Sequence, residues 1–276
     1  MQLACVWRGV TGFIGLLAWI YSAPAPAAWL QTRGSGLLIS TLSDYRADAR
    51  FDDFAVKAPD RAYRKQELSL YGVYGLTDGL TLGAQPSFYH LKVRPGAMAE
   101  RQGMLGLSHI ELFARTRLLA GDFWIVSAQA LVELPGARPV DREPLLESAS
   151  RDVEARLLYG RSGRFVKNFL NLEYFSSVEA GYRARDRRAA DQWRADATFG
   201  FRPSQKYQII LQGFNTISAS GADGSDPTAY DLYKAQISLV RDLPHNMALQ
   251  AGWFTEYAGR NTGAGNALFM AFWSRF

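Results

Sequence analysis

Apolar and polar residues alternate with a period of two along many short stretches of this chain. Residues 192–202 and 170–183 are the clearest examples. In the first stretch, one face consists of Trp193, Ala195, Ala197, Phe199 and Phe201, and the other of Arg194, Asp196, Thr198, Gly200 and Arg202. Because successive side chains of a strand point to opposite faces of the sheet, this pattern predicts strands with one apolar and one polar face.

Alternation of this kind recurs along the whole chain after residue 30 and predicts an all-β protein. The predicted strands span residues 35–45, 63–76, 80–92, 105–118, 123–134, 151–160, 167–183, 192–202, 207–217, 230–241, 247–257 and 265–276. No stretch in this part of the chain reaches the roughly 20 apolar residues that a membrane-spanning helix needs. A soluble antiparallel sheet would alternate in the same way, so the strands alone do not predict a membrane protein.

The lengths of the connectors between these strands favour a membrane barrel. The short connectors are 77–79, 120–122, the stretch around 162–163, 203–206 and 242–246, and the longer ones are 46–62, 93–104, 135–150, 184–191, 218–229 and 258–264. Outer-membrane barrels alternate short periplasmic turns with longer outer loops. The prediction is a single closed antiparallel transmembrane up-and-down barrel of about 12 strands, with both termini on the periplasmic side.

The first 27 residues resemble a signal peptide. Arg8 precedes an apolar stretch from Val10 to Tyr21, and small residues follow up to Ala27. Cleavage after Ala27 gives a signal peptide at 1–27 and an outer-membrane barrel at 28–276, and it removes the one cysteine of the chain, Cys5. A membrane anchor is the alternative, but the apolar stretch is shorter than a spanning helix.

The last predicted strand resembles the C-terminal signal that the outer-membrane barrel assembly machinery recognises. Leu268, Met270, Phe272 and Phe276 alternate on one face, and the sequence ends in this aromatic residue. Ser274 departs from the pattern, because an apolar or aromatic residue is more usual there. The strand predicts the assembly machinery as a partner, and the buried last strand of a soluble protein is the alternative.

Composition agrees with a barrel in the Gram-negative outer membrane. Hydrophobic residues make up 48% of the chain, yet the mean hydropathy is only −0.14. Aromatic residues, at 13%, suit strands and the aromatic belts at membrane interfaces. The net charge of +5 is spread along the chain, which argues against a nucleic-acid partner and is compatible with outer-membrane lipid, lipopolysaccharide or an anionic permeant.

The polar inner face of the predicted barrel is where a binding site is expected. The candidate binding residues in the lumen are Glu67, Tyr71, Tyr89, His109, Glu111, Arg115, Arg117, Glu154, Arg156, Glu173, Arg183 and Arg194. The same register directs inward Lys65, Gln85, Gln129, Glu133, Asp152, Glu179, Asp196, Gln212, Lys234, Gln236, Glu256 and Arg275. Acids and bases on neighbouring strands predict cross-strand ion pairs, which line a conduit in one interpretation and plug the barrel in the other.

Aromatic residues have two interpretations as well. Tyr71, Tyr89, Phe113 and Phe254 are predicted on the inner face, where they could line a path for an aromatic substrate. The interface belts are predicted to contain Tyr45, Phe88, Trp124, Tyr159, Tyr182, Trp193, Phe201, Tyr207, Tyr230 and Tyr257.

No catalytic residue, metal site or cofactor is predicted. A lipid hydrolase needs a serine beside a histidine, but Ser108 and His109 are adjacent in sequence and are expected on opposite faces of a strand. Asp223 and Asp226 could attract a surface cation, and a flexible outer loop is the alternative. A barrel without enzymatic activity is therefore expected.

Several blocks resemble a proteobacterial outer-membrane family that carries the label of the meta-pathway of phenol degradation, or a transporter-like barrel. The blocks are Arg64–Tyr71, Tyr74–Gly83, Gly106–Leu112, Tyr159–Ser162 and Ala258–Gly263. His109 departs from the pattern, since an acidic residue is commoner at that position. The resemblance implies a barrel and passage of small hydrophobic or aromatic compounds, and it implies no catalytic residues.

Three functions remain open from the sequence. The first is a narrow passive channel or uptake barrel for small molecules, with aromatic or hydrophobic compounds among them. The second is a structural or accessory barrel that its own ion pairs plug. The third is an outer-membrane lipid hydrolase, for which His109 is the best candidate residue.

Overall fold

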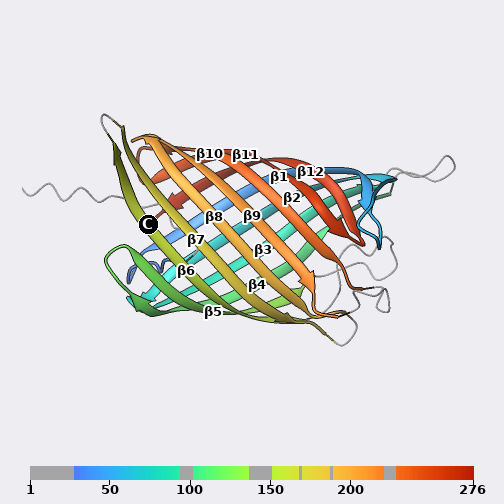
Figure 1. Ribbon diagram of the computed structural model, residues 1–276, viewed down its shortest axis with the longest axis horizontal. Coiled ribbons are helices and arrows are strands. Elements are labelled where there is room, and N and C mark those ends of the chain that lie inside the picture. The colour runs from blue at the N-terminus through green and yellow to red at the C-terminus, as the bar shows by residue number, and fades with distance from the viewer. Residues whose placement is uncertain (1–27, 94–101, 137–150, 168–169, 187–188, 221–227) are drawn as a thin grey trace, which may run out of the picture.

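The computed structural model is a closed barrel of twelve antiparallel strands (Figure 1). It describes residues 28–93, 102–136, 151–167, 170–186, 189–220 and 228–276. The strands are β1 (Gly36–Phe51), β2 (Lys57–Thr77), β3 (Leu80–Val93), β4 (Gln102–Ala120), β5 (Trp124–Pro135), β6 (Asp152–Lys167), β7 (Leu170–Ala184), β8 (Gln192–Ser204), β9 (Tyr207–Ser218), β10 (Asp231–Leu243), β11 (Met247–Arg260) and β12 (Thr262–Arg275). This confirms the predicted fold class and strand number.

Each strand pairs with its neighbours in sequence, and β1 pairs with β12 to close the ring. The backbone N–H of Gly36 donates to the carbonyl of Phe276, so β1 begins where β12 ends. We call this end of the barrel, which also holds the short turns 78–79 and 205–206, the turn end, and the opposite end the loop end.

The two faces of the barrel wall differ in polarity. Large apolar side chains such as Leu42, Trp193, Leu268 and Met270 point outward and are exposed. Charged side chains, including Arg115, Glu154 and Arg183, are buried on the inner face. A soluble protein has the opposite arrangement, whereas a barrel in lipid has an apolar outer band around a polar interior.

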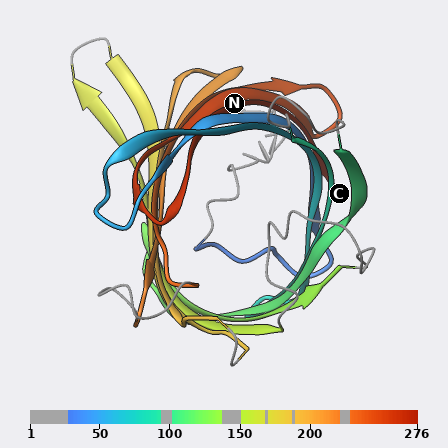
Figure 2. The same cartoon turned by 90° about the vertical axis from the view of Figure 1, so that its right-hand side faces the viewer.

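The predicted turn around residues 162–163 is wrong. Strand β6 continues to Lys167, and Ser162 pairs with Phe175 of β7. Glycine at position 163 leaves room for the ring of Tyr174, which a Cβ at this position would overlap. The β6–β7 hairpin extends beyond the rim of the barrel, as its yellow strands show in Figure 2.

The predicted loops at 46–62 and 258–264 are shorter than expected. Strand β1 continues to Phe51 and β2 begins at Lys57, while Asn261 alone separates β11 from β12. Asn261 adopts a φ of 51°, a left-handed conformation that asparagine tolerates better than most residues. Connector length therefore alternates less regularly than the sequence indicates.

The segment Ala28–Ser35, which we call the inner segment, lies inside the barrel near the turn end. Figure 2 shows it in dark blue within the ring of strands. Ala28, Trp29 and Leu30 pack against Ile125 of β5 and Leu158 of β6. No segment inside the barrel was expected from the sequence, and this one narrows the turn end of the lumen.

Some predictions concern residues outside the described part. The signal peptide at 1–27 and the loop that contains Asp223 and Asp226 are among them. Within the described residues, no helix is long and apolar enough to cross a membrane.

Candidate functional site: the lumen

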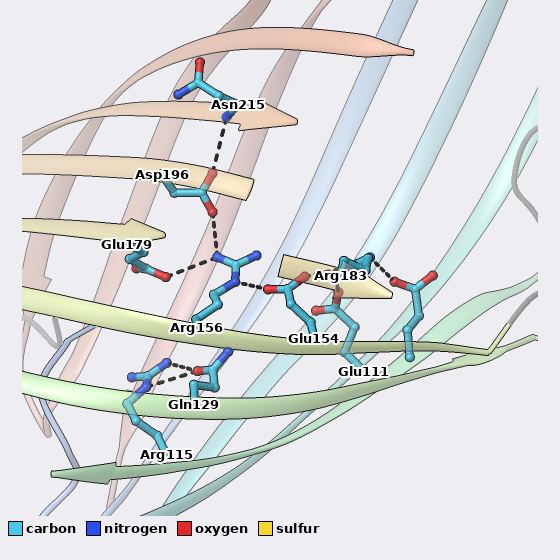
Figure 3. A network of polar contacts seen from close by, with 10 residues as sticks. Glu111, Arg115, Gln129, Glu154, Arg156, Glu179, Arg183, Asp196 and Asn215 are labelled. Carbon is cyan, nitrogen blue, oxygen red and sulfur yellow. Dashed lines mark hydrogen bonds and ion pairs between the residues drawn. The ribbon is translucent and has the colours of Figure 1, made fainter. Parts of the chain in front are cut away.

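Arg156 of β6 is the centre of a group of charged side chains on the inner wall (Figure 3). Its guanidinium binds Glu154 of the same strand, Glu179 of β7 at 3.2 Å and Asp196 of β8 at 2.6 Å. Asp196 also accepts a hydrogen bond from the backbone N–H of Asn215 on β9 at 3.3 Å. These contacts tie four consecutive strands together.

Arg183 of β7 extends the group toward β4. Its three nitrogens contact Glu154 at 2.6 Å, Glu133 of β5 at 2.6 Å and Glu111 of β4 at 3.3 Å. The side chain of Glu154 is 0% exposed and is shared between Arg156 and Arg183. We call the residues Glu111, Glu133, Glu154, Arg156, Glu179, Arg183 and Asp196 the ion-pair network.

Arg115 of β4 lies beside the network and binds neutral groups. Its Nε and one terminal nitrogen donate to the side-chain oxygen of Gln129 on β5 at 3.1 and 2.7 Å. The other terminal nitrogen is 3.4 Å from the carbonyl oxygen of Trp29 in the inner segment. Arg115 therefore connects the wall to the chain that lies within the lumen.

The network rests on the two-residue period of the strands. Because residues i and i+2 share a face, Glu154 and Arg156 both point inward, as do Arg183 and, on β8, Asp196. A buried charge is costly unless it is paired and hydrogen-bonded. Two guanidiniums among five carboxylates give each acid a partner and make removal of either arginine costly.

The structure brings together five of the twelve candidate binding residues. Glu111, Arg115, Glu154, Arg156 and Arg183 lie in or beside the network. The other seven lie elsewhere on the wall. Glu67 and Glu173 form ion pairs with Lys65 and Arg164, and Tyr71 stacks on Phe113. Tyr89 is buried, His109 lies against Ser108, Arg117 is exposed near the turn end, and Arg194 lies on β8. Their binding roles remain predictions.

Aromatic side chains line the opposite part of the wall, where β1, β2 and β9–β12 meet. The rings of Tyr45 and Tyr63 are 5.5 Å apart, and those of Tyr45 and Phe254 are 6.1 Å apart. The hydroxyl of Tyr45 donates a short hydrogen bond to Glu256, which also accepts the backbone N–H of Gly265. We call this part of the wall the aromatic side.

Tyr45 does not belong to an interface belt, so that prediction is wrong. Its side chain points inward and is only 5% exposed. The alternation of β1 places Tyr45 on the same face as Leu37 and Ala47, which are buried as well. Outward rings such as those of Trp124, Tyr159, Trp193 and Tyr257 are exposed, as an interface belt requires.

The expectation that Ser108 and His109 point to opposite faces is also wrong. Ser87 of β3 pairs with His109, but the next residue, Phe88, pairs with Leu107, so Ser108 is an extra residue in β4. Such a β-bulge interrupts the strict alternation of side chains. As a result, Ser108 Oγ and His109 Nδ1 lie 3.0 Å apart, and Ser108 is 2% exposed.

The inner segment is bound to the wall by polar contacts at several points. The hydroxyl of Ser127 donates to the carbonyl of Ala28 at 2.7 Å, and the backbone N–H of Gln31 donates to Thr81 at 2.9 Å. Arg33 forms a short parallel bridge with Gly75. Backbone groups that would otherwise be unsatisfied inside the barrel are thereby hydrogen-bonded.

Two glycines in the wall leave room for the inner segment. A side chain at Gly160 would overlap the ring of Trp29, and one at Gly75 would overlap the carbonyl of Thr32. Glycine allows this close approach because it has no Cβ. Isolated glycines within predicted strands, together with the apolar pair Trp29 and Leu30 outside any strand, were the sequence signals for this contact.

A metal site finds no support in the described part of the chain. No group of three or more histidine, cysteine, aspartate or glutamate side chains there could hold a metal ion. The carboxylates of the network are bound by arginine instead.

Comparison with known proteins gives matches in structure only. No family model and no curated protein matches the sequence. The fold is similar to the COG4313 outer membrane channel from Pseudomonas putida F1, with a TM-score of 0.68 and 15% identity over 92% of this chain and 100% of that chain.

Two further solved structures have lower scores. The KdgM porin in complex with disordered oligogalacturonate has a TM-score of 0.52 and 8% identity over 86% of this chain and 99% of its own. The transport unit of the autotransporter AIDA-I from Escherichia coli has a TM-score of 0.50 and 11% identity over 88% of this chain and 90% of its own. The chain therefore has the closed β-barrel fold found in outer-membrane proteins.

Proposed function

We propose that this chain is a narrow passive channel of the Gram-negative outer membrane, through which small molecules cross, with aromatic or hydrophobic compounds among them. The observation that carries the proposal is the closed barrel with an apolar outer face and with buried charged side chains on its inner face. The fold similarity to an outer membrane channel supports it. The turn end then faces the periplasm, because short turns lie on that side in barrels of this kind.

The structure supports a narrow channel rather than a wide one. Charges of opposite sign contact each other along the wall, and the inner segment lies within the ring near the turn end. Pore lining and constriction decide which solutes pass. A lumen with an ion-paired side and an aromatic side suits solutes that have both polar and apolar parts.

Conductance in planar lipid bilayers tests the proposal. The purified barrel is expected to give small, discrete current steps in KCl, and liposomes that contain it are expected to admit small solutes. A barrel that was heat-treated before insertion provides the control for leakage. Folded protein that gives neither current nor solute flux would contradict the channel.

A plugged structural barrel is the second candidate, and the inner segment favours it. Trp29→Ala removes the ring that packs on Gly160, and Gly160→Leu fills the space for that ring. Each change is expected to raise the conductance if the inner segment restricts the lumen. A matched control is Trp124→Ala, which removes an outward ring and should leave conductance unchanged.

A lipid hydrolase is the third candidate, because Ser108 and His109 are in contact. Histidine beside a serine hydroxyl is the arrangement that activates a nucleophile. Both side chains belong to the inner wall, however, and Ser108 is almost fully buried there. Purified protein is expected to hydrolyse no phospholipid or lipid A, and turnover that Ser108→Ala and His109→Ala both abolish would reverse this conclusion.

We also propose that this chain is related to the outer-membrane family that carries the label of phenol degradation. The resemblance of the blocks around Tyr74–Gly83 and Gly106–Leu112 supports it. Export through a signal peptide at 1–27 and assembly through the strand that ends at Phe276 are proposed with it.

A further inference from the structure

Lys234 of β10 is an inward-pointing cation on the aromatic side. Its ammonium nitrogen lies 4.5 Å from the ring centre of Phe214 on β9 and 4.8 Å from that of Phe254 on β11. Aromatic faces attract cations through the negative charge density of the ring. Within the described part of the chain, the ammonium makes no ion pair or hydrogen bond with another side chain.

Glu256 lies directly opposite Lys234 in the register of β10 and β11, and the negative charges of Asp196 and Glu67 also act on Lys234. Glu256 is bound by the hydroxyl of Tyr45 and by a backbone N–H. Asp196 is bound by Arg156 at 2.6 Å, and Glu67 by Lys65 at 2.8 Å. Each of these carboxylates therefore already has a different donor, and Lys234 is left with aromatic neighbours.

Arg194 of β8 is a second inward cation in this region. It pairs in register with Thr216 of β9, and Phe214 lies two residues before Thr216 on the same strand. Its charge acts on Lys234. Its Nε is buried and has no hydrogen-bond partner among the described residues. A buried donor without a partner is costly, so this nitrogen is a position that a bound acceptor would stabilise.

From these observations we infer that Lys234 and Arg194 form an anion-binding site in the lumen, and that its ligand is a small aromatic carboxylate. This inference rests on the proposed channel function and specifies the class of permeant. The carboxylate accepts hydrogen bonds from the ammonium and the guanidinium, and the ring lies against Phe214 and Phe254.

Charge and shape both favour this ligand class. Two neighbouring cations repel each other, and an anion between them removes that repulsion while accepting charge-assisted hydrogen bonds. A planar carboxylate matches the planar guanidinium better than a spherical chloride does. The rings of Phe214 and Phe254 add an apolar surface. An aromatic ring packed on this surface contributes more to the binding free energy than a methyl group does.

Equilibrium binding to the purified barrel in detergent tests the site without requiring a channel. The probes are benzoate, acetate and benzyl alcohol. Benzoate has both the carboxylate and the ring, acetate has only the carboxylate, and benzyl alcohol has the ring without a carboxylate. Calorimetry is expected to show benzoate binding most tightly. Lys234→Met keeps the length of the side chain without its charge, and it should weaken benzoate binding by about tenfold, the loss of one charge-assisted contact.

Three further variants separate charge from structure. Lys234→Arg should retain most of the affinity, and Arg194→Met should reduce it as Lys234→Met does. Lys206→Met, in the turn between β8 and β9, makes the same charge change outside the lumen and should have no effect. Circular dichroism and the heat-dependent gel mobility of barrels verify that each variant is folded.

Conductance with benzoate in the bath separates the site from the channel. Current steps that benzoate reduces in the wild type, and no longer reduces in Lys234→Met, support both. Current without any preference of the barrel for benzoate overturns the site and leaves the channel. Benzoate binding that depends on Lys234 in a barrel without current overturns the channel and leaves the site.

Discussion

Charged side chains have different kinds of partner on the two sides of the lumen. On the side formed by β4–β8, arginines and carboxylates contact one another directly, and Glu154 is shared by Arg156 and Arg183. On the aromatic side, Lys234 lies between two rings, and Glu256 is held by a tyrosine hydroxyl and a backbone N–H. The first side satisfies its charges internally, whereas the second leaves a cation available to a solute.

This difference separates stability from selectivity within one lumen. Charges that satisfy each other resist rearrangement, because removing one partner leaves the others buried and unpaired. A charged side chain with aromatic or neutral neighbours gives up fewer favourable contacts when a ligand approaches it. Stability is therefore expected to depend on the ion-pair network, and solute preference on the aromatic side.

Arg183→Met is expected to have the largest effect on stability. It leaves Glu111, Glu133 and Glu154 without one of their cations, and breaking a buried pair costs about 3–5 kcal/mol. Denaturant unfolding of the barrel folded in lipid vesicles measures this loss. The matched control is Arg46→Met, which breaks an exposed pair with Asp44 and should cost less than about 1 kcal/mol. Equal losses for the two variants would contradict a special role for the network.

Tyr45→Phe is expected to have an intermediate effect. It removes the hydroxyl that donates to Glu256 and keeps the stack with Tyr63 and Phe254. A hydrogen bond to a charged group contributes about 1.5–3 kcal/mol. Glu256 would then be free to pair with Lys234, its cross-strand neighbour, so benzoate binding should fall together with stability. A loss of stability without any change in binding would show that the two sides are not separated as described.

Glu173→Gln is expected to have the smallest effect. Glu173 pairs with Arg164 at 2.7 Å on the exposed hairpin of β6 and β7, outside the network. Exposed pairs contribute about 0.2–1 kcal/mol, so unfolding and conductance should remain close to wild type. A loss as large as that of Arg183→Met would place Glu173 in the network after all.

The sequence predicted the barrel well because a two-residue period is a local property. Alternation around Trp193 and Arg194 is visible without any knowledge of the partner strands. The closed barrel was predicted from the connector lengths and from the pattern of the last strand. The register also placed Glu154, Arg156 and Arg183 inward, as the structure does. Which of the inward charges touch depends on strand tilt and stagger, which a single strand does not encode.

The errors have local physical causes. A β-bulge at Ser108 shifts the alternation by one residue, and no turn residue marks it in the sequence. Gly163 and Asn261 belong to turn-forming residue types, yet the first lies within a strand and the second is a complete connection. Tyr45 was assigned to an interface belt from its residue type, although the alternation of its own strand places it inside.

The inner segment has a consequence for the order in which the barrel assembles. It leads directly into β1, and β1 together with β12 forms the seam that closes the ring. The carbonyls of Ala28 and Trp29 bind Ser127 of β5 and Arg115 of β4, which lie four and three strands from β1 along the wall. The inner segment thus crosses the lumen as a tether, and we expect it to hold β1 near β4 and β5 while β1 and β12 are being joined.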